Sequence, residues 1–138
     1  MTPSRLLVGL FMILNIGSCT SVPYQGDLTA RAVAQAWLAL VDSGQYGKAY
    51  DQYAARIKIA VSRERAISSW AGRRGPLGPV VSRQIVSSVF THTLKGAPDG
   101  TYEILHYRTS FQRKANAWEE VVVTKESGNW EVSGYHFK

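Results

Sequence analysis

Apolar residues in the first half of the chain recur at the spacing of an α-helix. A helical face with positions i, i+4, i+7 and i+8 is formed by Val33, Trp37, Leu40 and Val41. Asp27 or Thr29 can cap the start of this helix, and Gly44 can take the left-handed conformation that ends it. The pattern therefore predicts a helix from about Asp27 to Ser43.

Two further helices are predicted before residue 75. The second has a face at i, i+4, i+7 and i+11 that is formed by Tyr46, Tyr50, Tyr53 and Ile57. The third begins after Ser62, a capping residue, and runs to Ala71, with Gly72 ending it. Its buried face is expected to consist of Ala66, Ile67 and Trp70.

Beyond a loop rich in glycine and proline at 73–79, the apolar residues become β-branched and aromatic and their period changes to two. Four strands are predicted at 80–94, 101–113, 117–126 and 129–137, with a turn at 114–116. Helices followed by an antiparallel meander make an α+β fold, with the helices on one face of the sheet. The residues expected to be largely buried between them are Trp37, Tyr50, Trp70, Leu105 and Phe111.

Short sequence segments along nearly the whole folded region resemble a known family. They are Ala36-Trp37-Leu38, Asp42-Ser43-Gly44-Gln45-Tyr46, Trp70, Gly75-Pro76-Leu77-Gly78, Ser82-Arg83, Ala97-Pro98-Asp99-Gly100 and Trp130-Glu131-Val132-Ser133-Gly134-Tyr135. The family is the bacterial domain-of-unknown-function 4019 family. The resemblance implies a curved four-stranded antiparallel sheet wrapped around a helix, as in cystatin-like and nuclear-transport-factor-2-like folds, which often leave a conical pocket. It implies no activity.

The N-terminal segment has the features of an export signal. Arg5 precedes an apolar run at 6–16, which is long enough for a signal peptide and too short to cross a bilayer comfortably. Ile16-Gly17-Ser18-Cys19 at its end resembles the bacterial lipobox, whose cysteine is lipidated and becomes the new N-terminus. Ordinary secretory cleavage and a retained membrane anchor are the alternatives.

The predicted organisation is a signal peptide at 1–18, a lipidated Cys19 with a short tether at 19–26, and one domain at 27–138. Cys19 is the only cysteine, so the fold has no intramolecular disulfide. A lipidated Cys19 implies attachment to a membrane of the cell envelope. Thr20, where aspartate would favour the inner membrane, favours the outer membrane and a domain that faces the periplasm.

The whole chain has a formal net charge of +6, and its basic residues are concentrated in one part. Between residues 52 and 98, Glu64 is the only acid, beside eight basic residues: Arg56, Lys58, Arg63, Arg65, Arg73, Arg74, Arg83 and Lys95. One interpretation is a solvated helix surface that aids solubility. The other is a positive surface of Arg63, Arg65, Arg73 and Arg74 that contacts an anionic surface. The sequence contains no nucleic-acid-binding motif.

Residues with catalytic or metal-binding chemistry do not form a recognisable motif. His92, His106 and His136 are too far apart in sequence for a typical zinc motif, so no metal and no cofactor are predicted. Asp42 and Asp51, with nearby tyrosines, are the residue types of a ketosteroid-isomerase site. A helix end at Asp42 and a packed face of Tyr46 and Tyr50 explain these residues better, so no catalytic residue is assigned.

The sequence thus predicts an envelope lipoprotein whose domain binds an envelope protein or a small ligand without catalysis. A small pocket enzyme of the isomerase or hydratase type is the alternative. A carboxylate that points into the pocket would favour the enzyme.

Overall fold

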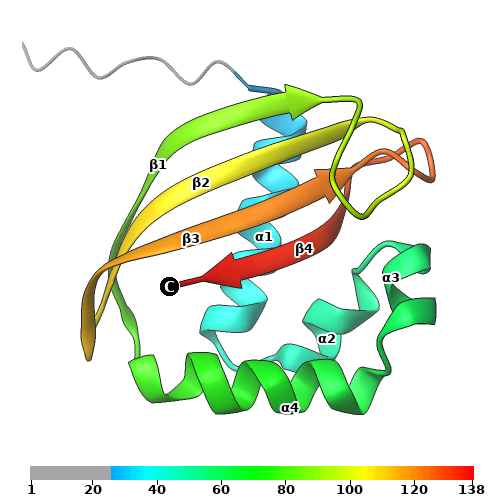
Figure 1. The fold of residues 1–138 in the computed structure, drawn as a ribbon. Helices are drawn as coiled ribbons and strands as arrows, with labels where there is room; N and C mark the ends of the chain where they lie inside the picture. The colour runs from blue at the N-terminus through cyan, green and yellow to red at the C-terminus, as the bar shows by residue number, and fades with distance from the viewer. Residues whose placement is uncertain (1–25) are drawn as a thin grey trace, which may run out of the picture.

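The computed structural model describes residues 26–138, which form four helices, a 3₁₀ turn and one four-stranded sheet (Figure 1). The α+β fold class is therefore confirmed. The predicted signal peptide and Cys19 lie outside the described residues.

The first helix, α1 (Leu28–Asp42), begins where the sequence placed its cap. The Asp27 carboxylate accepts hydrogen bonds from the backbone N–H groups of Thr29, at 2.7 Å, and Ala30, at 3.2 Å. These bonds satisfy two of the N–H groups that a helix start leaves without partners. The helix ends at Ser43, and Gly44 has a φ of 73°, as a left-handed helix end requires.

Asp27 also joins the helix to the sheet, because its carboxylate accepts a 3.1 Å hydrogen bond from the Trp130 indole. This bond and those from Ala30 and Thr29 lower the pKa of Asp27 below its ordinary value of 3.8. A lowered pKa stabilises the fold above the ordinary value, and that contribution is lost as the pH falls through the lowered one. We expect Asp27→Ala to reduce the thermal midpoint at pH 7 and to differ less from wild type near pH 2.

The measurement is a series of thermal unfolding curves from pH 7 to pH 2. Asp99→Ala removes the same charge from an exposed loop residue and serves as the control. A difference between Asp27→Ala and wild type that stays constant with pH would contradict the assignment.

The segment predicted as one second helix is two short helices, α2 (Tyr46–Asp51) and α3 (Ala55–Ala60). Tyr53, between them, forms a parallel bridge with Val132, and the Ala54 N–H donates to the Val132 carbonyl at 2.9 Å. The prediction of a continuous helix was wrong because this hydrogen bond holds the segment against the sheet in an extended form. The tyrosine spacing fits a helix, but the backbone partner is far away in sequence.

The next helix, α4 (Arg63–Arg74), begins at the predicted cap, where the Ser62 hydroxyl accepts from the Arg65 N–H at 3.3 Å. It does not end at Gly72 as expected, but continues to Arg74 and into the 3₁₀ turn η1 (Gly75–Leu77). A glycine inside a helix costs only about 1 kcal/mol. The buried contacts of Arg74, described below, offset that cost and carry the helix past Gly72.

The sheet is an antiparallel meander in the order β1 (Val80–Thr91), β2 (Tyr102–Phe111), β3 (Lys114–Thr124) and β4 (Glu131–Phe137). The four predicted strands are present; β1, β2 and β4 are shorter than predicted, whereas β3 begins three residues earlier and ends two residues earlier. The turn expected at 114–116 is at Gln112 and Arg113 instead, and β3 begins at Lys114.

The core lies between α1 and one face of the sheet, which we call the inner face. The predicted core residues are all at most 7% exposed: Trp37, Tyr50, Trp70, Leu105 and Phe111. The Trp37 ring stacks on Tyr53 at 5.6 Å and meets the edges of Trp70 and Tyr135 at 5.5 and 5.1 Å. These aromatic contacts join the helices to β4.

The helix α1 runs between two ends of the domain. At its start, the Asp27 N–H donates to the carboxylate of Glu103, near the beginning of β2. At its finish, Asp42 bonds Arg74 of α4, which lies across that end of the molecule (Figure 1). The start of the domain and α4 are therefore at opposite ends of α1.

Candidate functional site

A cluster of charged residues lies between the helices and the inner face of the sheet. At its centre is Arg83 of β1, which bonds two carboxylates. Its Nη1 donates to Asp42 at 2.6 Å, and its Nε donates to Glu119 at 2.7 Å. A second bond to each carboxylate, at 3.0 and 3.2 Å, makes both pairs bidentate. Bidentate arginine–carboxylate pairs are among the stronger and more directional hydrogen-bonded contacts in proteins.

The carboxylates of this cluster have additional partners. Glu119, which is fully buried, also accepts from the hydroxyls of Thr109 and Tyr135, each at 2.5 Å. Asp42 accepts from Arg74 at 3.0 Å, and Arg74 also donates to the Gly78 carbonyl at 2.8 Å. Four residues, Arg83, Arg74, Thr109 and Tyr135, therefore donate hydrogen bonds to these two carboxylates.

The pKa shifts in the cluster follow from burial and from these partners. Burial alone would lower the pKa of Arg83, but its hydrogen bonds to Asp42 and Glu119 raise that pKa above its ordinary value. Burial, followed by the negative charge of Glu119, raises the pKa of Tyr135. Burial raises the pKa of Tyr107 to about 12. The tyrosines thus stay neutral, and the Tyr135 hydroxyl remains a hydrogen-bond donor.

The structure places the residues considered for isomerase chemistry apart from one another. Asp42 belongs to the Arg83 cluster, whereas Asp51 is exposed and pairs with Arg63 at 3.4 Å. The Tyr50 hydroxyl donates to the carbonyl of Val61 at 2.7 Å. Neither aspartate therefore has a tyrosine hydroxyl among the hydrogen bonds described for residues 26–138.

The opposite, outer face of the sheet carries a row of polar side chains. Directly paired positions on β2, β3 and β4 place Glu120 between His106 and His136. His106 Nε2 contacts the Glu120 carboxylate at 3.1 Å, and its Nδ1 contacts the Ser87 hydroxyl at 2.8 Å. His92 lies beyond the end of β1, where its Nδ1 contacts the Gly100 carbonyl at 3.0 Å.

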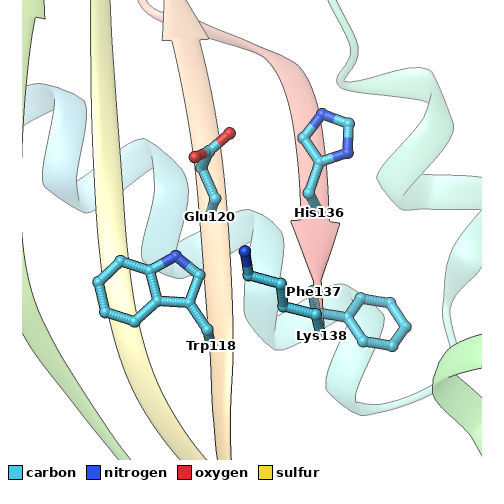
Figure 2. Close-up of a pocket in the computed structure, with 5 residues that line it drawn as sticks. All are labelled: Trp118, Glu120, His136, Phe137 and Lys138. Carbon is cyan, nitrogen blue, oxygen red and sulfur yellow. The ribbon is translucent and has the colours of Figure 1, made fainter.

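A shallow depression of about 140 Å³ adjoins this row at the end of β4, as Figure 2 shows. It is lined by Trp118, Glu120, His136, Phe137 and Lys138. In residues 26–138, no group of three or more metal-ligating side chains is positioned to hold a metal ion. The depression is small and open, and its mixture of aromatic and charged groups suits a polar surface contact.

The four arginines expected to form one positive surface are divided by the structure. Arg63, Arg65 and Arg73 are exposed on α4, which agrees with a surface position. Arg74 is only 3% exposed, and its guanidinium lies 4.2 Å from the centre of the Phe111 ring. The assignment of Arg74 to the surface was wrong, because Asp42 draws it into the buried cluster. We call Arg63, Arg65 and Arg73 the α4 arginines.

The comparison with known families decides where the chain belongs. The family described as Protein of unknown function (DUF4019) matches residues 33–135, which is most of the chain. The chain belongs to the DUF4019 family. No curated protein and no solved structure matches this DUF4019 chain. The resemblance seen in the sequence is thus confirmed for the family, while the cystatin-like or nuclear-transport-factor-2-like fold stays a prediction.

The Arg83 cluster was not predicted as a unit from the sequence, although one signal for it was present. Glu119 stands in an alternating pattern with Ala117, Val121 and Val123, which are all buried. A carboxylate at a core position of a strand needs a buried partner. That requirement predicts a buried Lys or Arg side chain. The sequence alone does not show that it is Arg83 rather than another of the eight basic residues between 52 and 98.

Proposed function

We propose that this DUF4019 chain is a lipid-anchored envelope protein whose domain binds a partner or ligand without catalysing a reaction. The observation that supports this is the state of the inward-facing carboxylates. Asp42 and Glu119 share Arg83, and Glu103 accepts from the Asp27 N–H and the Ser88 hydroxyl. A carboxylate that moves a proton must reach its substrate, and these are held by the protein's own donors.

The anchor in this proposal is Cys19, with attachment to the outer membrane and the domain in the periplasm. Residues 26–138 contain no helix that combines the length and apolarity needed to cross a membrane. We expect wild-type protein to partition into detergent and to carry an N-terminal mass increase from acyl groups on Cys19. Cys19→Ala should partition into water without that increase.

Partitioning with Triton X-114 and intact mass spectrometry are the measurements. Cys19→Ser is a second variant that keeps the size of the side chain, and it should behave as Cys19→Ala does. An unmodified wild-type N-terminus in the aqueous phase would refute the anchor.

The surface that we propose for binding is formed by the α4 arginines. All three side chains are exposed, and Arg73 lies against the Phe137 ring at 5.1 Å, beside the depression at the end of β4. Cations near a helix C-terminus are mildly stabilising, which explains Arg73, and Arg63 forms an exposed pair with Asp51. Neither reason applies to Arg65, which lies near the start of α4. An anionic binding partner, such as phospholipid headgroups, suits all three exposed side chains.

Cosedimentation with vesicles of anionic phospholipid tests this surface. Each basic residue near such a membrane contributes about 1 kcal/mol, so replacing the α4 arginines by serine should weaken binding at low salt by about 100-fold. Binding of wild type should decrease as the salt concentration rises. The protein used is the Cys19→Ala variant, which has no lipid of its own.

The matched control replaces Lys95, Lys114 and Lys125 by serine, which removes the same charge from exposed positions outside α4. It should retain most of the binding. Equal loss in both triple variants would show that net charge acts rather than this surface, and binding independent of salt would refute the electrostatic contact.

A further inference from the structure

The edge strand β1 exposes apolar side chains in its second half. Val86, Val89 and Phe90 are 46%, 45% and 57% exposed. They belong to an edge strand: β1 pairs with β2 on one side and with no strand of the described chain on the other (Figure 1). An edge of this kind can pair with another strand.

The usual protections of an edge strand are confined to the first half of β1. Register shifts near Val81 and Val86 interrupt the pairing with β2, whereas pairing is regular from Ser87 to Thr91. The strand contains no proline, and its one charged residue, Arg83, is held inside the cluster. Residues 87–91 are therefore an uncharged, regular and partly apolar edge.

We propose that this edge pairs with the same edge of a second copy of the chain, antiparallel, about a two-fold axis at Ser88. This register places Val86 of each copy opposite Phe90 of the other. It also places Ser87 opposite Val89. Ser88 and Phe90 lie opposite the buried residues Leu105 and Glu103 on β2, so they are on the inner face. Val86 lies within the register shift between Ile85 and Ser87, so strand alternation from Ser88 does not assign its face.

The position of the domain start suits pairing with a second copy of the chain. The Ser88 hydroxyl donates to Glu103, and Glu103 accepts from the backbone N–H of Asp27. A two-fold axis at Ser88 therefore brings the two domain starts close to the axis. An axis perpendicular to the sheet also keeps both sets of helices, and both domain starts, on one side of the paired sheets.

This geometry suits two copies that are anchored in one membrane, and in that respect the inference rests on the proposed lipid at Cys19. Attachment to one membrane raises the local concentration of the copies. The positive charge of α4 does not oppose this contact. Ser88 is eight residues from the start of β1, which places it about 26 Å along the strand from the end that lies near α4. The α4 arginines of the two copies therefore stay apart.

The test uses the chain with Cys19→Ala, so that its outcome does not depend on lipidation. Analytical ultracentrifugation should show a monomer–dimer equilibrium that depends on protein concentration. Val89→Lys places two like charges at the apolar edge and should weaken dimerisation by at least tenfold, with an unchanged thermal midpoint. Gln84→Lys, on the same strand before the second register shift, should leave the dimer intact.

A cross-link tests the register. Directly opposed residues on antiparallel strands have Cβ atoms about 4.5–5.5 Å apart, close enough for a disulfide after small adjustments. Ser88→Cys should form a disulfide-linked dimer under mild oxidation, and Gln84→Cys should not. A Cys19→Ala protein with no other change that stays monomeric at several hundred micromolar would overturn the proposal. Equal cross-linking of both cysteine variants, or attachment of this edge to a different protein in intact cells, would also overturn it.

Discussion

Replacing Arg83 by methionine is expected to lower the free energy of unfolding by about 3 kcal/mol. The change leaves the fully buried Glu119 and the partly buried Asp42 without the cation that they share. Removing one partner of a buried ion pair costs about 3–5 kcal/mol, and the lower end applies because a quarter of the Asp42 side chain is exposed. Urea denaturation followed by tryptophan fluorescence measures the effect.

The matched control is Arg63→Met, which breaks the exposed pair with Asp51. Surface pairs contribute about 0–1 kcal/mol, so this variant should remain close to wild type. Arg83→Lys keeps the charge but loses the bidentate fork, and its stability should fall between that of wild type and that of Arg83→Met. An Arg83→Met protein as stable as the Arg63→Met protein would show that the cluster does not hold the fold together.

Truncating Trp37 to alanine is expected to cost about 3–5 kcal/mol, because the side chain is fully buried and the cavity cannot refill easily. Its ring contacts Tyr53, Trp70 and Tyr135, which come from three other parts of the chain. The variant should unfold at a much lower urea concentration with a similar slope.

Trp37→Phe separates packing from hydrogen bonding. It keeps an aromatic ring but removes the indole N–H that donates to the Ala49 carbonyl at 2.9 Å. The lost hydrogen bond accounts for about 1 kcal/mol, and the smaller ring adds to that loss. A Trp37→Ala midpoint equal to that of Trp37→Phe would contradict the central place of this ring in the core.

The parts of the fold that depend on local pattern were predictable. The caps at Asp27 and Ser62 and the buried aromatic positions follow from residue type and spacing within a few turns of helix. The break at Tyr53 was not predictable, because its cause is a hydrogen bond to Val132, almost eighty residues later. The predicted end of α4 at Gly72 was wrong for a similar reason. The contacts that continue this helix to Arg74 come from Asp42 and Phe111, which are distant in sequence.

The candidate sites show the same division. Exposure of Arg63, Arg65 and Arg73 agrees with the surface position expected from their charge. Arg74 is the next residue along the chain, yet it turns inward to Asp42. Charge counting treats adjacent arginines alike, whereas burial distinguishes them by which carboxylate lies within reach. The buried Arg83 cluster required the sheet register before its members could be recognised together.

The helix α1 sets a distance between the two ends of the domain. Its fifteen residues span about 22 Å at 1.5 Å per residue. This is more than twice the Debye length of about 8 Å at physiological ionic strength. In a copy anchored near Asp27, with α1 upright on the membrane, the headgroups beneath the domain are screened from the α4 arginines. Under the periplasmic anchoring proposed above, such a copy would act as a spacer, with its positive end presented to a second anionic surface.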